Sequence, residues 1–201
     1  MTTKDLQNRL QPWLQRWSLG DAAGTAFAGT DDWLGKMTLA TYSADEYLVH
    51  VGDVGDTLYL IDAGLVRLFY TSADGKERNK AFMTEGQVAG PVSAAITGTA
   101  APFAIAALEP TVVLTFPYSG LLAAASKNPQ VAQLHLNLLS NAFIRNEQRE
   151  AMLLTLNAQQ RYEWLLEHEK HLLDRVPQFH IASYLGVDAV SLSRLKRKLK
   201  T

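Results

Sequence analysis

Apolar and polar residues follow three different patterns along the chain. From Asp5 to Trp17, leucine and tryptophan recur every three or four residues, which predicts an amphipathic helix that Pro12 interrupts. From about Met37 to Pro117, short apolar runs alternate with turn residues, as is typical of strands. Beyond Pro117 the helical spacing returns. The pattern therefore predicts a helical start, a strand-rich middle and a helical C-terminal part.

The strand-rich middle contains many short β-strands separated by turns. The runs at 47–51, 57–61 and 65–70 have strand composition, and glycine-containing pairs separate them. Asp74-Gly75 predicts a hairpin, because glycine readily adopts the positive φ that such a turn needs. Short strands at this spacing predict an antiparallel β-roll or jelly roll.

A long helix is predicted after the strands. Residues 121–125 form one short helical segment, and Pro129 stands at the favoured first-turn position of the next. Residues 130–156 contain no glycine or proline, so one helix could span ~40 Å. Such a helix could pack along the β-domain or pair with a second copy. Its length favours the dimer helix, because it exceeds what one small β-domain can cover.

The most specific stretch is PQFHIASYLGVDAVSLSRLKRKL, residues 177–199. Its spacing is that of a helix-turn-helix. Ala182 is small where two helices cross closely, Gly186 permits the tight turn, and Leu192 buries the second helix. We expect a pair of short helices here.

The second helix of this pair has an outward face of hydroxyls and cations. Ser191, Arg194 and Lys198 share the face opposite its leucines. Arginine can bind guanine through two hydrogen bonds, and lysine neutralises phosphate. An ordinary helix pair with a solvated basic end is the alternative, but the spacing and the face together favour DNA binding. The candidate DNA contacts are Gln178, Ser191, Ser193, Arg194, Arg197 and Lys198.

The net charge of the whole chain does not support DNA binding, but its distribution along the chain does. The 201 residues carry 19 basic and 20 acidic side chains, a net charge of −1, which argues against a generic polyanion binder. Residues 1–156 hold 11 basic and 15 acidic side chains, a net of −4, whereas residues 157–201 hold 8 and 5, a net of +3. The positive excess therefore lies on the segment with the helix-turn-helix spacing.

The absence of cysteine excludes several kinds of chemistry. Disulfides, iron–sulfur clusters, cysteine-based zinc sites and cysteine nucleophiles all need a residue that this chain lacks. The first residues have no apolar core of a signal peptide, and no run approaches 18 apolar residues. We expect a soluble, cytoplasmic protein with no membrane partner.

The helix-turn-helix segment resembles that of the Crp/Fnr superfamily of bacterial transcription factors, in its Ile-Ala-x-Tyr-Leu-Gly and Val-Ser-Leu-Ser-Arg runs. The strand region resembles the superfamily's cyclic-nucleotide-binding-type β-roll, with Gly52, Gly64 and the Asp74-Gly75 hairpin where its turns fall. The long helix resembles its dimerisation helix. The resemblance covers residues 37–199 and is weak before residue 37.

The resemblance implies an α+β fold in three parts. These are N-terminal helices with an antiparallel β-roll (1–129), a dimerisation helix (130–156) and a helix-turn-helix domain (157–201). No C-terminal wing follows the last helix, so we expect fewer phosphate contacts and a shallower salt dependence. The implied function is a regulator that binds a palindromic operator as a homodimer. Ala189 and Val190 stand where the best-known member carries base-reading side chains, which implies a different operator.

The ligand cassette of the β-roll departs from the superfamily's pattern. Pro91 stands where a glutamate would hold the ribose, and Ala101 stands where an arginine would pair with the cyclic phosphate. No cation lies between Lys80 and Lys127, and an unpaired phosphate is costly to bury. We therefore expect no response to cyclic AMP. The candidate pocket either holds a small uncharged or apolar effector or is packed shut; its candidate residues are Gly90, Pro91, Ala101 and Pro102.

No catalytic or metal signature organises the remaining polar residues. His168 and His171 are the only histidine pair at helical spacing, and such a pair is more often a solvated face than a metal site. No nucleophile elbow or glycine-rich phosphate loop is present. We expect neither an enzyme nor a cofactor. The alternative function is a ligand-binding or protein-interaction module that has lost specific DNA binding.

Overall fold

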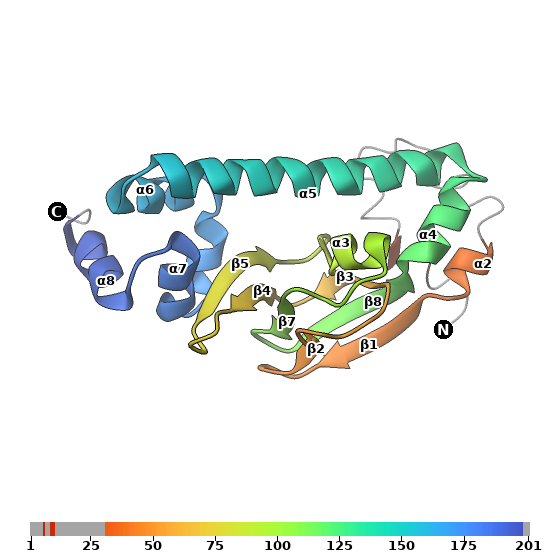
Figure 1. Ribbon diagram of the computed structural model, residues 1–201, viewed down its shortest axis with the longest axis horizontal. Helices are drawn as coiled ribbons and strands as arrows, with labels where there is room; N and C mark the ends of the chain where they lie inside the picture. The colour runs from red at the N-terminus through yellow and green to blue at the C-terminus, as the bar shows by residue number, and fades with distance from the viewer. Residues whose placement is uncertain (1–5, 7–8, 11–30, 199–201) are drawn as a thin grey trace. The chain divides into compact units, whose positions relative to one another are not determined.

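The computed structural model describes residue 6, residues 9–10 and residues 31–198 (Figure 1). The chain divides into two compact units, and each is described by itself. The first comprises residues 1–68 and 82–141, and the second comprises residues 69–81 and 142–201. A hairpin from the strand region thus belongs to the same unit as the C-terminal helices. Most of the helix predicted over 5–17 lies outside the described residues, but Leu6 and Leu10 are helical and buried.

Within the described part of the chain, eight strands form two four-stranded sheets. In chain order they are β1 (Thr38–Tyr42), β2 (Tyr47–Val49), β3 (Thr57–Ala63), β4 (Val66–Thr71), β5 (Glu77–Met83), β6 (Val88–Ala89), β7 (Ala104–Ala107) and β8 (Thr111–Pro117). One sheet has the order β1-β8-β3-β6, and the other has the order β2-β7-β4-β5. The pairings of β1 with β8, β2 with β7, and β3 with both β6 and β8 are antiparallel. The predicted α+β fold with antiparallel sheets is confirmed.

The turn between β3 and β4 depends on a glycine. Gly64 has a φ of +99°, and a Cβ added there would lie 2.5 Å from the Thr111 Oγ1 atom. Thr111 is itself buried at the start of β8. Only glycine fits both the backbone conformation and this close approach.

Short helices of the first unit lie beside its strands. These are α2 (Asp31–Leu34), α3 (Val92–Thr97) and α4 (Tyr118–Ala125). Figure 1 shows α2 and α4 together beside the end of the strands, where they contact one another. Trp33, Leu121 and Leu134 join the strand residues Leu58 and Leu114 in one buried apolar cluster. Burial of this cluster anchors the helices to the sheet.

The long helix α5 (Pro129–Thr155) begins and ends within one residue of its predicted limits. The Asn128 side chain caps it, because its Oδ1 atom accepts hydrogen bonds from the Gln130 amide at 2.9 Å and the Val131 amide at 3.2 Å. The helix contributes residues 129–141 to the first unit and residues 142–155 to the second.

The second unit contains the remaining helices. They are α6 (Ala158–His168), a short 3-10 helix η2 (Lys170–Asp174), α7 (Gln178–Leu185) and α8 (Ala189–Lys198). Asn157 forms a capping box with Gln160 at the start of α6. The helices α6, α7 and α8 contact one another pairwise, around the fully buried Leu165, Leu185 and Leu192.

Candidate nucleic-acid interface

The turn between α7 and α8 has the geometry that the sequence spacing predicted. Gly186 adopts a left-handed conformation with a φ of +66°. Its amide donates to the Ser183 carbonyl at 3.2 Å, and the Val187 amide donates to the Ala182 carbonyl at 3.0 Å. This pair of bonds is a Schellman motif, which ends α7 and turns the chain directly into α8. Ala182 and Leu192 are buried, as their predicted roles at the helix crossing require.

Asp188 caps the start of α8. Its Oδ1 atom accepts from the Ser191 amide at 2.8 Å, and its Oδ2 atom accepts from the Ser191 hydroxyl at 2.6 Å. The hydrogen bond from the Ser191 side chain, followed by that from its backbone, lowers the pKa of the Asp188 carboxyl. The Ser191 hydroxyl proton is therefore committed to the cap, and its oxygen is left to act as an acceptor.

The predicted contact residues lie on these two helices. Gln178 is the exposed first residue of α7, and Arg194, Arg197 and Lys198 are exposed on α8. Ser191 and Ser193 are half-buried. Lys198 donates from its Nζ atom to the Gln159 Oε1 atom at 3.2 Å, across to α6. The cations of α8 also lie at its C-terminal end, where the helix dipole favours positive charge.

Sequence reasoning did not single out Phe179. It lies beside Gln178 on α7, and 60% of its surface is exposed. Val190 at the start of α8 is equally exposed. Large exposed apolar side chains beside a cationic helix are suited to contact with thymine methyl groups. In the sequence, Phe179 is an apolar residue at the second position of α7. Helical periodicity alone would place such a residue in the core.

The hairpin of β4 and β5 is bonded to α7. The buried Asn79 side chain donates from Nδ2 to the His180 carbonyl at 3.0 Å, and the Asn79 backbone amide donates to the Ser183 hydroxyl at 3.1 Å. The Ser183 hydroxyl in turn donates to the Glu77 carbonyl at 3.1 Å. The hairpin and α7 therefore form one hydrogen-bonded assembly within the second unit.

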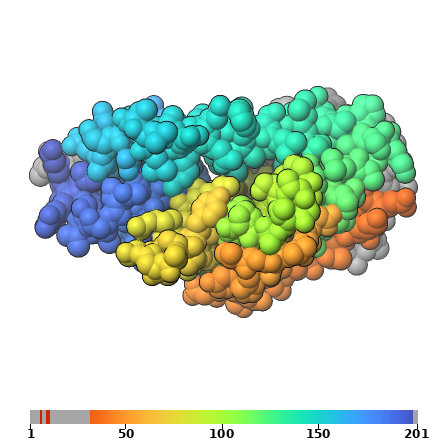
Figure 2. Space-filling model, in the orientation of Figure 1, coloured from red at the N-terminus to blue at the C-terminus, as the bar shows by residue number. Residues whose placement is uncertain are grey.

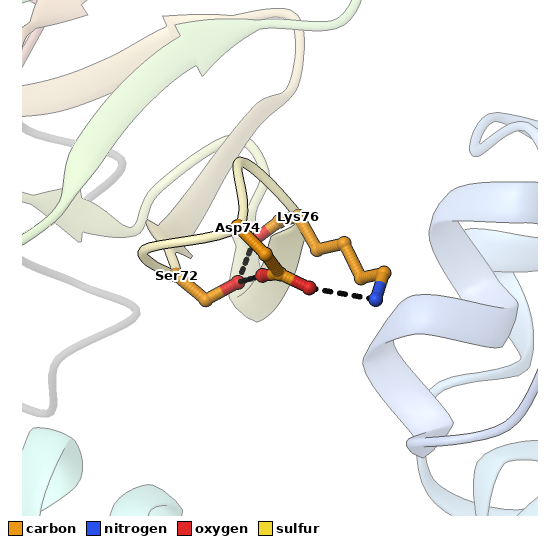
Figure 3. A network of polar contacts seen from close by, with 3 residues as sticks. All are labelled: Ser72, Asp74 and Lys76. Atoms are coloured by element: carbon orange, nitrogen blue, oxygen red, sulfur yellow. Dashed lines mark hydrogen bonds and ion pairs between the residues drawn. The ribbon is translucent and has the colours of Figure 1, made fainter.

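The tip of this hairpin has its own polar network (Figure 3). The Asp74 carboxylate accepts from the Lys76 ammonium at 2.6 Å and from the Ser72 hydroxyl at 2.5 Å, and the latter also bonds to the Lys76 carbonyl. The hydrogen bond from Lys76, and then that from Ser72, lower the pKa of Asp74. Gly75 has a φ of +78°, as the predicted hairpin turn requires.

An arginine of α5 lies between the hairpin and α7. The Arg149 Nη2 atom donates to the Asn79 carbonyl at 2.8 Å and to the Tyr184 carbonyl at 2.7 Å. Its guanidinium lies 3.9 Å above the centre of the Tyr184 ring. Burial raises the pKa of the Tyr184 hydroxyl well above its usual value, with a further contribution from the Glu169 carboxylate. Tyr184 therefore stays neutral, and the contact is a cation–π interaction.

The predicted effector pocket residues lie in the first unit, around α3. Pro91 precedes α3 and is buried, and Ala101 is 2% exposed. A Cβ on Gly90 would lie 2.4 Å from the Leu58 Cδ2 atom, so close packing explains this glycine. Pro102 is exposed. Figure 2 shows α3 and the segment after it, in light green, as part of the visible surface.

Ala101 also makes backbone bonds that occupy its polar groups. Its amide donates to the Asp53 carbonyl at 2.8 Å, and its carbonyl accepts from the Gly52 amide at 2.9 Å. The side chains of Pro91 and Ala101 have no polar atoms. Neither position can therefore provide the carboxylate or guanidinium that would bind a ribose or a cyclic phosphate.

Two further findings concern the described residues. No three histidine, aspartate or glutamate side chains among them come together to hold a metal ion. None of the helices they form has the length and apolar character needed to cross a bilayer.

Several known proteins are similar to this chain in sequence. Residues 39–128 match the cyclic nucleotide-binding domain. The fumarate and nitrate reduction regulatory protein of Vibrio cholerae is 27% identical over 159 residues, which cover 74% of this chain and 63% of that protein. The cyclic AMP receptor protein of Thermus thermophilus is 32% identical over 129 residues, 57% of this chain and 59% of that protein. The chain thus spans less than two thirds of the length of these relatives.

Solved structures show the same similarity over a larger part of the chain. FixK2 from Bradyrhizobium japonicum superposes with a TM-score of 0.72 at 25% identity, covering 82% of this chain and 84% of that one. The catabolite activator protein of Thermus thermophilus has a TM-score of 0.52 at 25% identity, covering 87% and 86%. In domain match, sequence and fold, the chain is similar to regulators of the Crp/Fnr superfamily, the resemblance that its helix-turn-helix residues predicted.

Proposed function

We propose that this protein is a DNA-binding transcriptional regulator that binds a palindromic operator as a homodimer and does not respond to cyclic AMP. The observation that carries the proposal is the exposed cationic face of α8. The helix α8 follows a Schellman turn and contacts α7, and its opposite face carries the buried Leu192. A helix presented in this way can enter the major groove, where side chains read the edges of the bases.

The surface of α5 supports the homodimer. Leu136, Phe143 and Leu154 are each more than half exposed, and their separations of seven and eleven residues bring them to one side of the helix. Exposed apolar side chains at such spacing form the seam of paired helices. A two-fold dimer presents two copies of α8, and two-fold symmetry in the protein calls for a palindromic DNA site.

The lack of a cyclic AMP response rests on Pro91 and Ala101. Both are buried and apolar at the two positions where the superfamily's cassette would need charged side chains. A small uncharged effector and a permanently filled interior are both compatible with these residues. The burial of both side chains favours the filled interior.

Selection of DNA by the full chain is the test. Duplexes bound from a random pool would be sequenced and then titrated, and we expect an enriched motif with two-fold symmetry. A pool that shows no enriched motif after repeated selection would contradict the proposal. It would favour instead the alternative of a ligand-binding or protein-interaction module on the same scaffold.

A further inference from the structure

The carbonyl groups at the C-terminal end of α7 need hydrogen-bond donors from outside the helix. The last four carbonyls of a helix have no partner within it. In α7 these are the carbonyls of residues 182–185, and the Schellman turn provides donors for the first two. The carbonyls of Tyr184 and Leu185 remain, and each accepts from an arginine of another helix. Arg149 of α5 donates to the first at 2.7 Å, and Arg161 of α6 donates to the second at 3.0 Å.

Arg161 bonds to two helix ends at once. Its Nη1 atom donates to the Leu185 carbonyl, its Nη2 atom donates to the Leu153 carbonyl at 2.8 Å, and its Nε atom donates to the Leu156 carbonyl at 2.9 Å. Leu153 lies in the last turn of α5, and Leu156 follows that helix directly. One guanidinium therefore joins the C-terminal end of α5 to the C-terminal end of α7.

Only arginine has the donors for this arrangement. Its planar guanidinium carries five N–H groups in fixed directions, whereas a lysine ammonium is a single centre on a flexible stem. The positive charge also lies at the negative ends of two helix dipoles. The turn leaves room for it: a Cβ on Gly186 would lie 3.1 Å from the Arg161 Nη1 atom and 3.4 Å from the Leu153 Cδ2 atom.

We propose that Arg161 is a positioning residue for DNA recognition, which fixes the direction of α8 relative to the end of α5 without touching DNA. The turn that Arg161 holds is three residues long, from Gly186 to Asp188, and α8 begins directly after it. A change in how the end of α7 is held is thus transmitted to the recognition helix. This proposal rests on the proposed function, because it assigns a role within DNA binding.

The test compares Arg161→Lys and Arg161→Met with the matched control Arg78→Lys in the full chain. Arg78 is exposed on the hairpin of the same unit. Each protein is titrated by fluorescence anisotropy with a duplex selected by the wild-type chain and with a scrambled duplex of the same composition. Titrations are run at several salt concentrations and at a temperature where circular dichroism shows native helix content.

We expect both Arg161 variants to bind the selected duplex between about 3-fold and 30-fold more weakly, a range typical of residues that act without ligand contact. Affinity for the scrambled duplex and its dependence on salt stay unchanged, because both depend on phosphate contacts. Arg78→Lys changes neither affinity. A merely structural role for Arg161 would lower thermal stability but leave the ratio of the two affinities unchanged. That result would overturn the proposal, and so would an equal loss on both duplexes.

Amide spectra provide a second measurement, independent of DNA. In Arg161→Lys we expect the amide resonances from Gly186 through Leu192 to shift, while those of the first half of α5 stay in place. Unshifted α8 amides would overturn the positioning role whatever the binding data show. By contrast, a wild-type chain that does not distinguish the two duplexes would refute the proposed function itself, so the two failures can be told apart.

Discussion

Asp188 directly precedes α8 and Ser191 lies in its first turn, and the hydrogen bonds between them limit what each side chain can contribute to DNA binding. The sequence pattern placed Ser191 on the reading face, but its hydroxyl donates to the Asp188 carboxylate. Ser191 can therefore accept a hydrogen bond from a base, such as from the amino group of cytosine or adenine, but its proton is already engaged. Asp188 places a negative charge at the start of the helix, where it favours the helix and repels phosphate.

The Asp188 cap predicts a pH dependence of stability. Its pKa is lower in the folded chain than in an unfolded one, so its contribution is present above the unfolded pKa of about 3.9 and is lost as the pH falls through the folded pKa. We expect Asp188→Ala to be less stable than the wild type in urea at pH 7 and to differ less from it at pH 3. Asp174→Ala, an exposed aspartate of η2, is the control for charge alone. A stability difference that does not change with pH would contradict the assignment.

Arg194 and Lys198 are expected to differ in what they contribute to binding. If Arg194 binds a guanine through two hydrogen bonds, Arg194→Ala should cost about 1–3 kcal/mol on the selected duplex and relax the preference at one base pair. Lys198→Ala should weaken all duplexes similarly and lower the salt slope by about one. Titrations against single-base variants of the selected site measure both effects. An unchanged affinity of Arg194→Ala at moderate salt would remove α8 as the recognition helix.

At the scale of elements, the helices α7 and α8 meet at one glycine, Gly186. Gly186 has a left-handed backbone, and a Cβ added there would lie only 3.1 Å from the Arg161 Nη1 atom and 3.4 Å from the Leu153 Cδ2 atom. Gly75 at the hairpin tip has a similar φ of +78°, but a Cβ there would meet no atom within 4 Å. Comparing Gly75 with Gly186 therefore separates two costs of adding a side chain: the strain of a left-handed backbone, which both positions share, and steric crowding, which only Gly186 has.

Gly186→Ala should therefore destabilise the chain more than Gly75→Ala. Both substitutions place a Cβ in the left-handed region, which costs about 1–2 kcal/mol per residue. Gly186→Ala also displaces the Arg161 guanidinium from the Leu185 carbonyl. Urea unfolding of the two variants measures the difference. Equal destabilisation would mean that the close approach to Arg161 has no energetic weight.

The second element-scale prediction concerns α5. Phe143 is 62% exposed in the single chain, on the stripe that we assign to the dimer. Phe143→Glu should convert the dimer to a monomer, because paired charges replace paired apolar side chains at the seam. Gln148→Glu, on an exposed position of the same helix, is the matched control. Sedimentation equilibrium reports the molecular mass, and a wild-type mass equal to that of one chain, 22.2 kDa, would contradict the dimer.

At the scale of the whole molecule, charge is divided between different parts of the chain. The net charge of −1 combines an acidic first part with a basic C-terminal segment. The exposed cations of α8 are the basic component of the proposed DNA interface, and the cassette between Lys80 and Lys127 has no cation. A phosphate-bearing effector would therefore find no counter-charge from that segment.

Cyclic AMP should consequently leave the stability of the protein unchanged. A ligand that binds the folded state at about 100 times its Kd adds about 2.7 kcal/mol. We expect no rise in Tm when cyclic AMP is added at millimolar concentration, measured by differential scanning fluorimetry. Phosphate at the same concentration controls for weak anion effects. A clear rise with cyclic AMP alone would show that the chain binds the nucleotide without the charged pair.

Much of the fold could be predicted from local sequence. The Asp74-Gly75 hairpin, the limits of α5 and the α7–α8 turn all follow from residues within a few positions of one another. Glycine conformations and helix periodicity carry that information directly. The assignment of the hairpin to the C-terminal unit could not be predicted in this way. It depends on bonds such as that from the Asn79 side chain to the His180 carbonyl, between residues 101 positions apart.

The features of the candidate site likewise fall into those that the sequence predicted and those that only the structure revealed. The sequence by itself determined that a helix-turn-helix with a cationic outer face exists and that the cassette lacks its charged pair, because both depend on residue type at fixed spacing. The Asp188–Ser191 cap is a local contact between residues three positions apart. Only the tertiary structure decided that Phe179 is exposed and that Arg161 joins the ends of α5 and α7. The physical reason is that the partner of a polar group is set by which helix ends meet in space, and periodicity does not encode that.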